Sequence, residues 1–226
     1  MSTTYDIPNT TAKVLLDVPA LATDTVVLVL PGISGKVFSD RYQSLVDALV
    51  GGGMAVARLN IWEGEEEVLE MTIDNIQRDI NLAVEWVLGQ GYTKVAAVGK
   101  SFGGGMVLAN TNQKIFAKVL WAPAIGVTEE GETFSQLRLQ KLRNLRLSLL
   151  GITLDHAHLA TYTGAVCLIH GTADQAIPFS NSEKIQALIP GSVSVPIEGA
   201  DHSYRDRAHE AQVIAHTVSS IQQSLR

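Results

Sequence analysis

A short glycine-rich segment, Gly99-Lys100-Ser101-Phe102-Gly103, constrains the fold of this chain more than any other stretch. It directly follows an apolar run at residues 94–98 and directly precedes a helix-like stretch at residues 104–110. A serine in such a turn takes a strained backbone conformation, and glycines two residues to either side let the strand and the helix approach each other. The motif alone also fits a plain glycine-rich turn. Its strand-turn-helix context favours a nucleophile elbow that projects the Ser101 hydroxyl above the edge of a sheet.

Apolar runs rich in β-branched residues alternate with stretches of helical spacing along most of the chain. Residues 25–30 are almost wholly apolar and end at Pro31-Gly32, which is typical of a strand buried on both faces of a parallel sheet. We therefore expect an α/β fold with a mostly parallel sheet and helices on both faces. The expected strands are residues 13–18 (a short edge strand), 25–30, 54–59, 94–98, 115–121, 164–170 and 193–197, and the expected helices are residues 41–50, 71–88, 104–110, 182–189 and 210–225.

The length of 226 residues fits a single domain, because α/β folds of about 200–250 residues are commonly undivided. We find no repeat, low-complexity stretch or linker within residues 1–226. The longest segment between two expected strands is residues 125–163, which we expect to form a short lid. This segment is locally basic, which fits either a solvated helix face or recognition of an acidic substrate. Its basic residues are Arg138, Lys141, Arg143 and Arg146.

The composition argues against several classes of function. A net charge of -6 and a pI near 5.5 do not suit a partner rich in phosphate, so we expect neither nucleic acid nor a membrane surface as a partner. The single cysteine, Cys167, excludes an intrachain disulfide, and its apolar surroundings predict a buried, inert thiol. Residues 1–13 lack the apolar core of a signal peptide, and we expect a cytoplasmic location.

Polar residues follow two further expected strands at the edge where ligands bind in such sheets. Asp174 lies in a polar turn after residues 164–170, and His202 precedes the last expected helix. Alone, Asp174 also fits a turn or cap residue and His202 an exposed loop histidine. Their order along the chain, Ser101, then Asp174, then His202, is the order expected when an elbow serine works with an acid and a histidine from the last two strands. Three more carboxylates, Asp201, Glu129 and Glu130, are candidates for the acid.

Three segments together resemble the α/β-hydrolase superfamily: residues 99–104, residues 170–178 and residues 199–202. They are similar to its nucleophile, acid and histidine motifs, and the resemblance implies the α/β-hydrolase fold. The compact size is similar to that of the small serine esterases and the dienelactone-hydrolase-like group, although the latter typically have a cysteine where this chain has Ser101. Residues 30–35 resemble the oxyanion loop of the superfamily, although Pro31 stands where many members have histidine.

The resemblance assigns a role to each residue type. Ser101 is the expected nucleophile, His202 the general base and acid, and Asp174 the group that orients the imidazole. The amides of Ile33 and Phe102 are the expected oxyanion donors. This chemistry needs no metal or other cofactor, and His156 and His158 are better explained as lid residues than as metal ligands.

Four residues are candidates for the substrate pocket: Ser34, Trp62, Lys100 and Trp121. Trp62 adjoins an acidic stretch, residues 63–70, which we expect to be an exposed loop. Trp121 fits either the core or an acyl pocket. Lys100 either points behind the sheet, where it reaches solvent or an acidic neighbour, or favours esters that carry a remote carboxylate.

The sequence therefore predicts a serine hydrolase that cleaves carboxylic esters of small acyl or aryl substrates through an acyl-enzyme. The same three residues also suit reactions on other acyl bonds, as in a thioesterase, a peptidase or an acyltransferase. A hydrolase-like binding module without activity is a further possibility. We expect a small-molecule ester as the partner, and a monomer or a homodimer.

Overall fold

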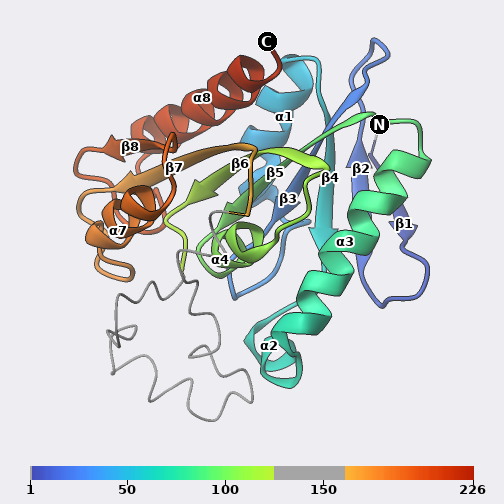
Figure 1. The fold of residues 1–226 in the computed structure, drawn as a ribbon, viewed down its shortest axis with the longest axis horizontal. Coiled ribbons are helices and arrows are strands. Elements are labelled where there is room, and N and C mark those ends of the chain that lie inside the picture. Colours follow the sequence, from blue (N-terminus) through green and yellow to red (C-terminus); the bar gives the residue numbers. More distant parts are fainter. Residues whose placement is uncertain (1, 125–160) are drawn as a thin grey trace.

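The computed structural model describes residues 2–124 and 161–226. Eight strands in these ranges form one sheet in the order β1-β2-β4-β3-β5-β6-β7-β8 (Figure 1). Only the pairs β1–β2 and β2–β4 are antiparallel, so the sheet is mostly parallel, as predicted. The strands are β1 (Ser2–Asp6), β2 (Lys13–Asp17), β3 (Thr25–Leu30), β4 (Ala55–Asn60), β5 (Lys94–Lys100), β6 (Ile115–Trp121), β7 (Ala165–Gly171) and β8 (Val193–Ile197).

Helices cover both faces of the sheet (Figure 1). α1 (Gln43–Gly51), which follows the short 3-10 helix η1 (Asp40–Tyr42), packs on one face together with α8 (Arg207–Ser224). α3 (Ile73–Gly89), α4 (Phe102–Ala109) and α7 (Ser180–Leu188) pack on the other face. The short helix α2 (Glu65–Glu70) precedes α3.

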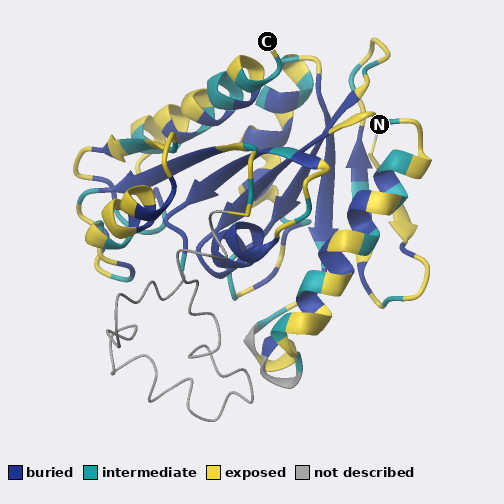
Figure 2. Ribbon diagram, in the orientation of Figure 1, coloured by how far each residue is buried: buried dark blue, intermediate teal, exposed yellow. Residues whose placement is uncertain are grey.

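β3 shows why the central strands are apolar throughout. All six of its residues are buried, and the central strands are dark blue in Figure 2. Val27 and Val29 face the core under α1 and α8, whereas Val26 and Leu28 face the core under α3 and α4. Because successive side chains of a strand point to opposite faces, a sheet covered on both sides requires apolar residues at every position.

α3 illustrates the helical pattern on which the sequence prediction relies. The Thr72 hydroxyl caps its first turn by accepting a hydrogen bond from the Asn75 amide at 3.1 Å. Its apolar face is buried against the sheet, at residues Ile76, Ile80, Ala83, Val84 and Val87. This packing fixes the segment that leads into β5, the strand that ends directly before Ser101.

Two elements differ from the sequence prediction. The sequence does not predict β1, because all five of its residues are exposed and carry no apolar pattern; it, and not β2, forms the edge of the sheet. The sequence predicts an exposed loop at residues 63–70, whereas residues Glu65–Glu70 form the helix α2. The predicted lid at residues 125–163 lies outside the described residues, apart from its last three.

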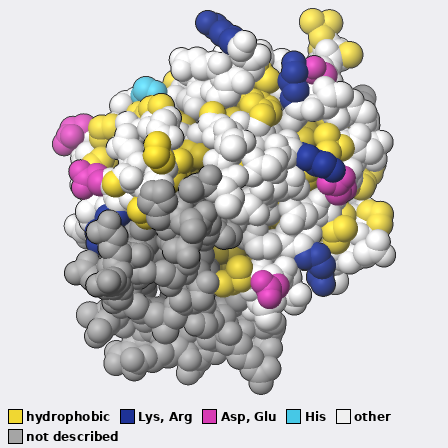
Figure 3. Space-filling view, viewed as in Figure 1, with side chains coloured by type: hydrophobic (Ala, Val, Ile, Leu, Met, Phe, Trp, Pro, Cys, Tyr) yellow, Lys and Arg dark blue, Asp and Glu magenta, His cyan; other side chains and the backbone are white. Residues whose placement is uncertain are grey.

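The distribution of surface charge and the character of the helices can be compared with the partners expected from the sequence. Charged side chains of both signs are scattered over the face shown in Figure 3 and do not gather into one patch among the atoms coloured there. In residues 2–124 and 161–226, no helix has both the length and the apolar character needed to cross a bilayer. The cytoplasmic location stays a prediction.

Cys167 is buried in β7, and burial raises the pKa of its thiol, which disfavours the reactive thiolate.

Candidate active site

Ser101 lies in a tight turn between β5 and α4. Its φ is 51° and its ψ is -117°, a left-handed conformation that is strained for a residue with a side chain. A Cβ atom at Gly99 would lie 2.6 Å from the Gly103 carbonyl oxygen, and one at Gly103 would lie 2.1 Å from the Pro31 carbonyl oxygen. Only glycine therefore fits at both positions of the motif, and the strand-turn-helix geometry is the one the sequence predicts.

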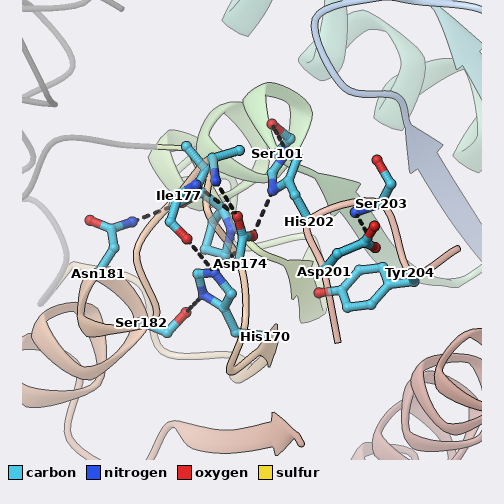
Figure 4. A network of polar contacts seen from close by, with 12 residues as sticks. Ser101, His170, Asp174, Ile177, Asn181, Ser182, Asp201, His202, Ser203 and Tyr204 are labelled. Atoms are coloured by element: carbon cyan, nitrogen blue, oxygen red, sulfur yellow. Dashed lines mark hydrogen bonds and ion pairs between the residues drawn. The ribbon is translucent and has the colours of Figure 1, made fainter. Parts of the chain in front are cut away.

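Three side chains from distant parts of the chain form one chain of hydrogen bonds (Figure 4). His202, in the loop between β8 and α8, has its Nε2 atom 3.1 Å from the Ser101 Oγ atom. Its Nδ1 atom is 2.6 Å from the Asp174 Oδ2 atom, in the loop that follows β7. A carboxylate can only accept, so Nδ1 carries the proton and Nε2 is left to accept from the serine hydroxyl.

Asp174 is held by four hydrogen bonds. Its Oδ1 atom accepts from the amides of Ala176 at 2.7 Å and Ile177 at 2.8 Å. Its Oδ2 atom contacts His202 and, at 3.2 Å, the Nε2 atom of His170. Burial raises the pKa of Asp174, but the bonds from His170, His202 and Ile177 outweigh it, so the net pKa is lowered. Asp174 is therefore a carboxylate at neutral pH.

Asp201, which the sequence also offers as the acid, has a different environment. Its Oδ1 atom accepts from the backbone amides of Ser203 at 3.0 Å and Arg205 at 3.2 Å, which stabilises the turn after His202. The His202 imidazole donates its Nδ1 proton to Asp174 instead. The two remaining candidate acids, Glu129 and Glu130, lie outside the described residues.

The segment after β3 lies directly beside Ser101. A Cβ atom at Gly32 would be 3.6 Å from the Ser101 Cβ atom, and the Gly35 amide closes a turn by donating to the Gly32 oxygen at 3.0 Å. Ile33 lies in this turn, and Phe102 is the first residue of α4, where amides have no partner within the helix. Neither amide donates a hydrogen bond within the described part of the chain. Ser34 is exposed in this turn, and its contact with substrate stays a prediction.

Trp62 does not line a pocket, so that prediction is wrong. Its side chain is 0 % exposed, and its Nε1 atom donates to the Gly32 carbonyl oxygen at 3.0 Å. Its ring also meets the Phe102 ring edge to face, with centroids 5.3 Å apart. Trp62 therefore supports the loop beside Ser101 from inside the core.

Lys100 and Trp121, which are predicted to line the substrate pocket, face the side of the sheet under α8 and not the loop beside Ser101. The Trp121 Nε1 atom donates to the Thr217 hydroxyl of α8 at 2.8 Å. The Lys100 Nζ atom lies 5.6 Å from the centre of the Tyr204 ring. Both line a small hollow behind the His202 loop, which neither Ser101 nor His202 lines. Burial and the nearby Arg41 lower the pKa of Lys100 to about 8.

The sequence prediction assigns no role to His170, which the structure places against Asp174. It is a fully buried polar residue near the end of the apolar strand β7, four residues before Asp174. That placement is the signal that could have drawn attention to it.

Within the described ranges, no three His, Cys, Asp or Glu side chains are grouped so that they could hold a metal ion. His156 and His158 lie outside those ranges. The expectation that the chemistry is metal-free stays a prediction.

A sequence model of the prolyl oligopeptidase family (Peptidase_S9) matches residues 65–225, well over half of the chain. The chain belongs to the prolyl oligopeptidase family. This is a family of serine hydrolases, so the predicted enzyme class is confirmed. The matched range includes Ser101, Asp174 and His202. No curated protein matches the chain.

Solved structures support the fold of this prolyl oligopeptidase family member. Est1E from Butyrivibrio proteoclasticus is 18% identical, with a TM-score of 0.71, over 98% of this chain and 99% of that chain. A dienelactone hydrolase from Anabaena variabilis is 17% identical, with a TM-score of 0.74, over 99% and 96%. A butyrate-bound esterase, Est2, from Thermogutta terrifontis is 18% identical, with a TM-score of 0.73, over 99% and 93%. The predicted α/β-hydrolase fold is confirmed.

Proposed function

We propose that this protein hydrolyses carboxylic esters of small acyl or aryl substrates through an acyl-enzyme on Ser101. The observation that supports the proposal is the hydrogen-bonded chain Ser101–His202–Asp174 at a strained elbow, with distances of 3.1 Å and 2.6 Å. A serine hydroxyl is a weak nucleophile, and a neighbouring imidazole that accepts its proton makes attack on an acyl carbon feasible at neutral pH.

The first half-reaction forms the acyl-enzyme. Ser101 Oγ attacks the ester carbonyl carbon while its proton moves to His202 Nε2, which gives a tetrahedral intermediate and an imidazolium. Asp174 stabilises that imidazolium through the Nδ1 proton. His202 then donates the proton to the leaving alcohol oxygen as the carbon–oxygen bond of the ester breaks.

The negative charge of the tetrahedral intermediate requires donors that are already in place. The amides of Ile33 and Phe102 border Ser101 and make no other hydrogen bond within the described residues. The Phe102 amide also belongs to the first turn of α4, whose dipole favours negative charge. Loss of one such donor typically costs about 10²–10³ in rate.

The second half-reaction regenerates the enzyme. A water molecule attacks the acyl carbon while His202 Nε2 takes one of its protons. The second tetrahedral intermediate then collapses, the bond to Ser101 Oγ breaks, and His202 returns the proton to that oxygen. The products are the carboxylic acid and the free serine.

The names of the similar structures favour ester cleavage. They include Est1E with bound ferulic acid and the Thermogutta terrifontis esterase with bound butyrate, an aryl acid and a small acyl acid. Peptide cleavage is the second candidate, because the family is named for an oligopeptidase. The same three residues suit both reactions, since both pass through an acyl-enzyme.

Fluorophosphonate labelling combined with a substrate panel tests the proposal. Only an activated serine reacts with the probe, so wild-type protein should be labelled and Ser101→Ala should not. The panel consists of p-nitrophenyl acetate and butyrate, methyl ferulate, and peptide p-nitroanilides of matched size. Faster turnover of the esters supports an esterase, and faster turnover of the anilides supports the peptidase. Absence of both labelling and turnover would refute a catalytic function.

A further inference from the structure

His170 lies directly behind the carboxylate of Asp174 (Figure 4). Its side chain is 0 % exposed, and both of its ring nitrogens have partners. Nε2 is 3.2 Å from the Asp174 Oδ2 atom and 3.0 Å from the Ile177 carbonyl oxygen. Nδ1 is 2.7 Å from the Ser182 hydroxyl oxygen, on α7. A histidine buried this completely has a fixed ring orientation.

The partners of His170 determine where its ring protons lie. A carboxylate at neutral pH and a backbone carbonyl can only accept hydrogen bonds, so Nε2 must carry a proton and donate it. The Ser182 hydroxyl can donate to Nδ1, which completes the network with a neutral ring. Without the Nε2 proton, the Asp174 and Ile177 oxygens would both face the lone pair of a buried nitrogen, which is repulsive.

The bonds of Asp174 divide evenly between its two oxygens. The backbone amides of Ala176 and Ile177 hold Oδ1, whereas His170 and His202 share Oδ2. His170 is thus the only side chain other than His202 that hydrogen-bonds this carboxylate within the described residues. Together with the two amides and His202, its donor restricts the rotation of the carboxylate.

We propose that His170 is a positioning residue, which holds Asp174 Oδ2 in line with His202 Nδ1. The proposal rests on the proposed hydrolysis through Ser101. The other charged or titratable groups that act on Asp174 or border it are His202, Lys100 and Tyr204. Lys100 and Tyr204 make no hydrogen bond to the carboxylate, so they do not replace the His170 donor.

His170→Phe removes the donor and keeps a ring in the cavity. Because the carboxylate then turns more freely, kcat should fall about ten- to hundredfold, well short of the roughly 10⁴-fold loss that follows when the acid itself is replaced. KM should change little, because His170 does not touch the substrate.

Two variants control for a purely structural role. His170→Gln places an amide donor near the position of Nε2 and should keep most of kcat. Ser182→Ala removes the bond to the other ring nitrogen without touching Asp174, and should keep kcat even if it lowers the melting temperature. Active sites are counted by fluorophosphonate titration, so that misfolded protein does not count toward kcat.

The result that would overturn the proposal is a His170→Phe protein with wild-type kcat per labelled site. Equal losses in His170→Phe, His170→Gln and Ser182→Ala would also overturn it, since they would indicate general loosening of the loop.

If wild-type protein neither labels nor turns over ester, the proposed function fails, and NMR still tests His170. The His202 Nδ1 proton should give a downfield resonance in wild type and His170→Gln that shifts or broadens in His170→Phe. An unchanged resonance in His170→Phe would refute the positioning role independently of activity.

Discussion

Lys118 is a buried cation whose replacement should change how stability depends on pH. Its side chain is 0 % exposed in β6, its Nζ atom donates to the Asn110 carbonyl oxygen, and it lies 3.5 Å from the centre of the Tyr162 ring. No carboxylate within the described residues forms an ion pair with it. Burial lowers the pKa of Lys118 from 10.5 to about 7, because a charge without water is costly.

The sign of the effect follows from counting protons. In the unfolded chain Lys118 keeps its proton up to pH 10.5, whereas in the folded protein it releases it near pH 7. Between these values the unfolded state binds more protons, so the free energy of unfolding rises with pH, by up to about 1.4 kcal/mol per unit. From pH 7 to pH 9.5 this group alone contributes a rise of about 3 kcal/mol.

Lys118→Met has nearly the same shape and no charge, so it isolates this contribution. Urea unfolding followed by circular dichroism at several pH values from 6 to 9.5 gives the free energy of unfolding of both proteins. The contributions of the other titrating groups cancel when the free energy of unfolding of the wild type is subtracted from that of Lys118→Met. This difference should be largest at low pH, in favour of the methionine variant, and should decline by about 3 kcal/mol between pH 7 and pH 9.5. Parallel pH curves for the two proteins would refute the reasoning.

Three further predictions concern the site. Ser101→Ala and His202→Ala should each reduce ester turnover nearly as far as the double variant, because groups that act as one unit are strongly non-additive; additive losses measured in kcat would contradict the triad. Lys100→Met should change kcat/KM equally for neutral and carboxylate-bearing esters of one size, since the amine points toward Tyr204; a selective loss for the anionic ester that shrinks with salt would contradict this. EDTA should leave turnover unchanged, and a loss that added metal restores would overturn the metal-free mechanism.

Burial explains which elements the sequence could predict. β3 and β6 have the predicted bounds, because strands in the covered part of the sheet carry apolar runs that end sharply. β1 has no such run, since its residues are all exposed and its place in the sheet comes from pairing with β2. Exposed edge strands are specified by backbone hydrogen bonds more than by side chains, so composition does not reveal them.

The site could be predicted only as far as the topology determines it. Ser101, Asp174 and His202 follow the parallel strands β5, β7 and β8, so their meeting at the carboxyl edge of the sheet follows from the strand order. The role of His170 could not be predicted in the same way. A buried histidine at a strand end has many partners available to it, and only the path of the chain from Asp174 to Ile177 selects the carboxylate and the carbonyl.

Lys100 shows how position in the sequence differs from position at the site. It adjoins Ser101, yet Gly99 packs against Gly103 of α4, and side chains alternate along a strand, so Lys100 must face the opposite side of the sheet. The pairing of Lys100 with Trp121 in neighbouring strands puts both side chains on that same side, under α8. The Ser101 hydroxyl does not follow this alternation, because the chain leaves the strand in a turn at Ser101, whose φ is 51°. Lys100 therefore belongs to the packing behind the sheet, whereas the loop that contains Ile33 lies directly beside Ser101.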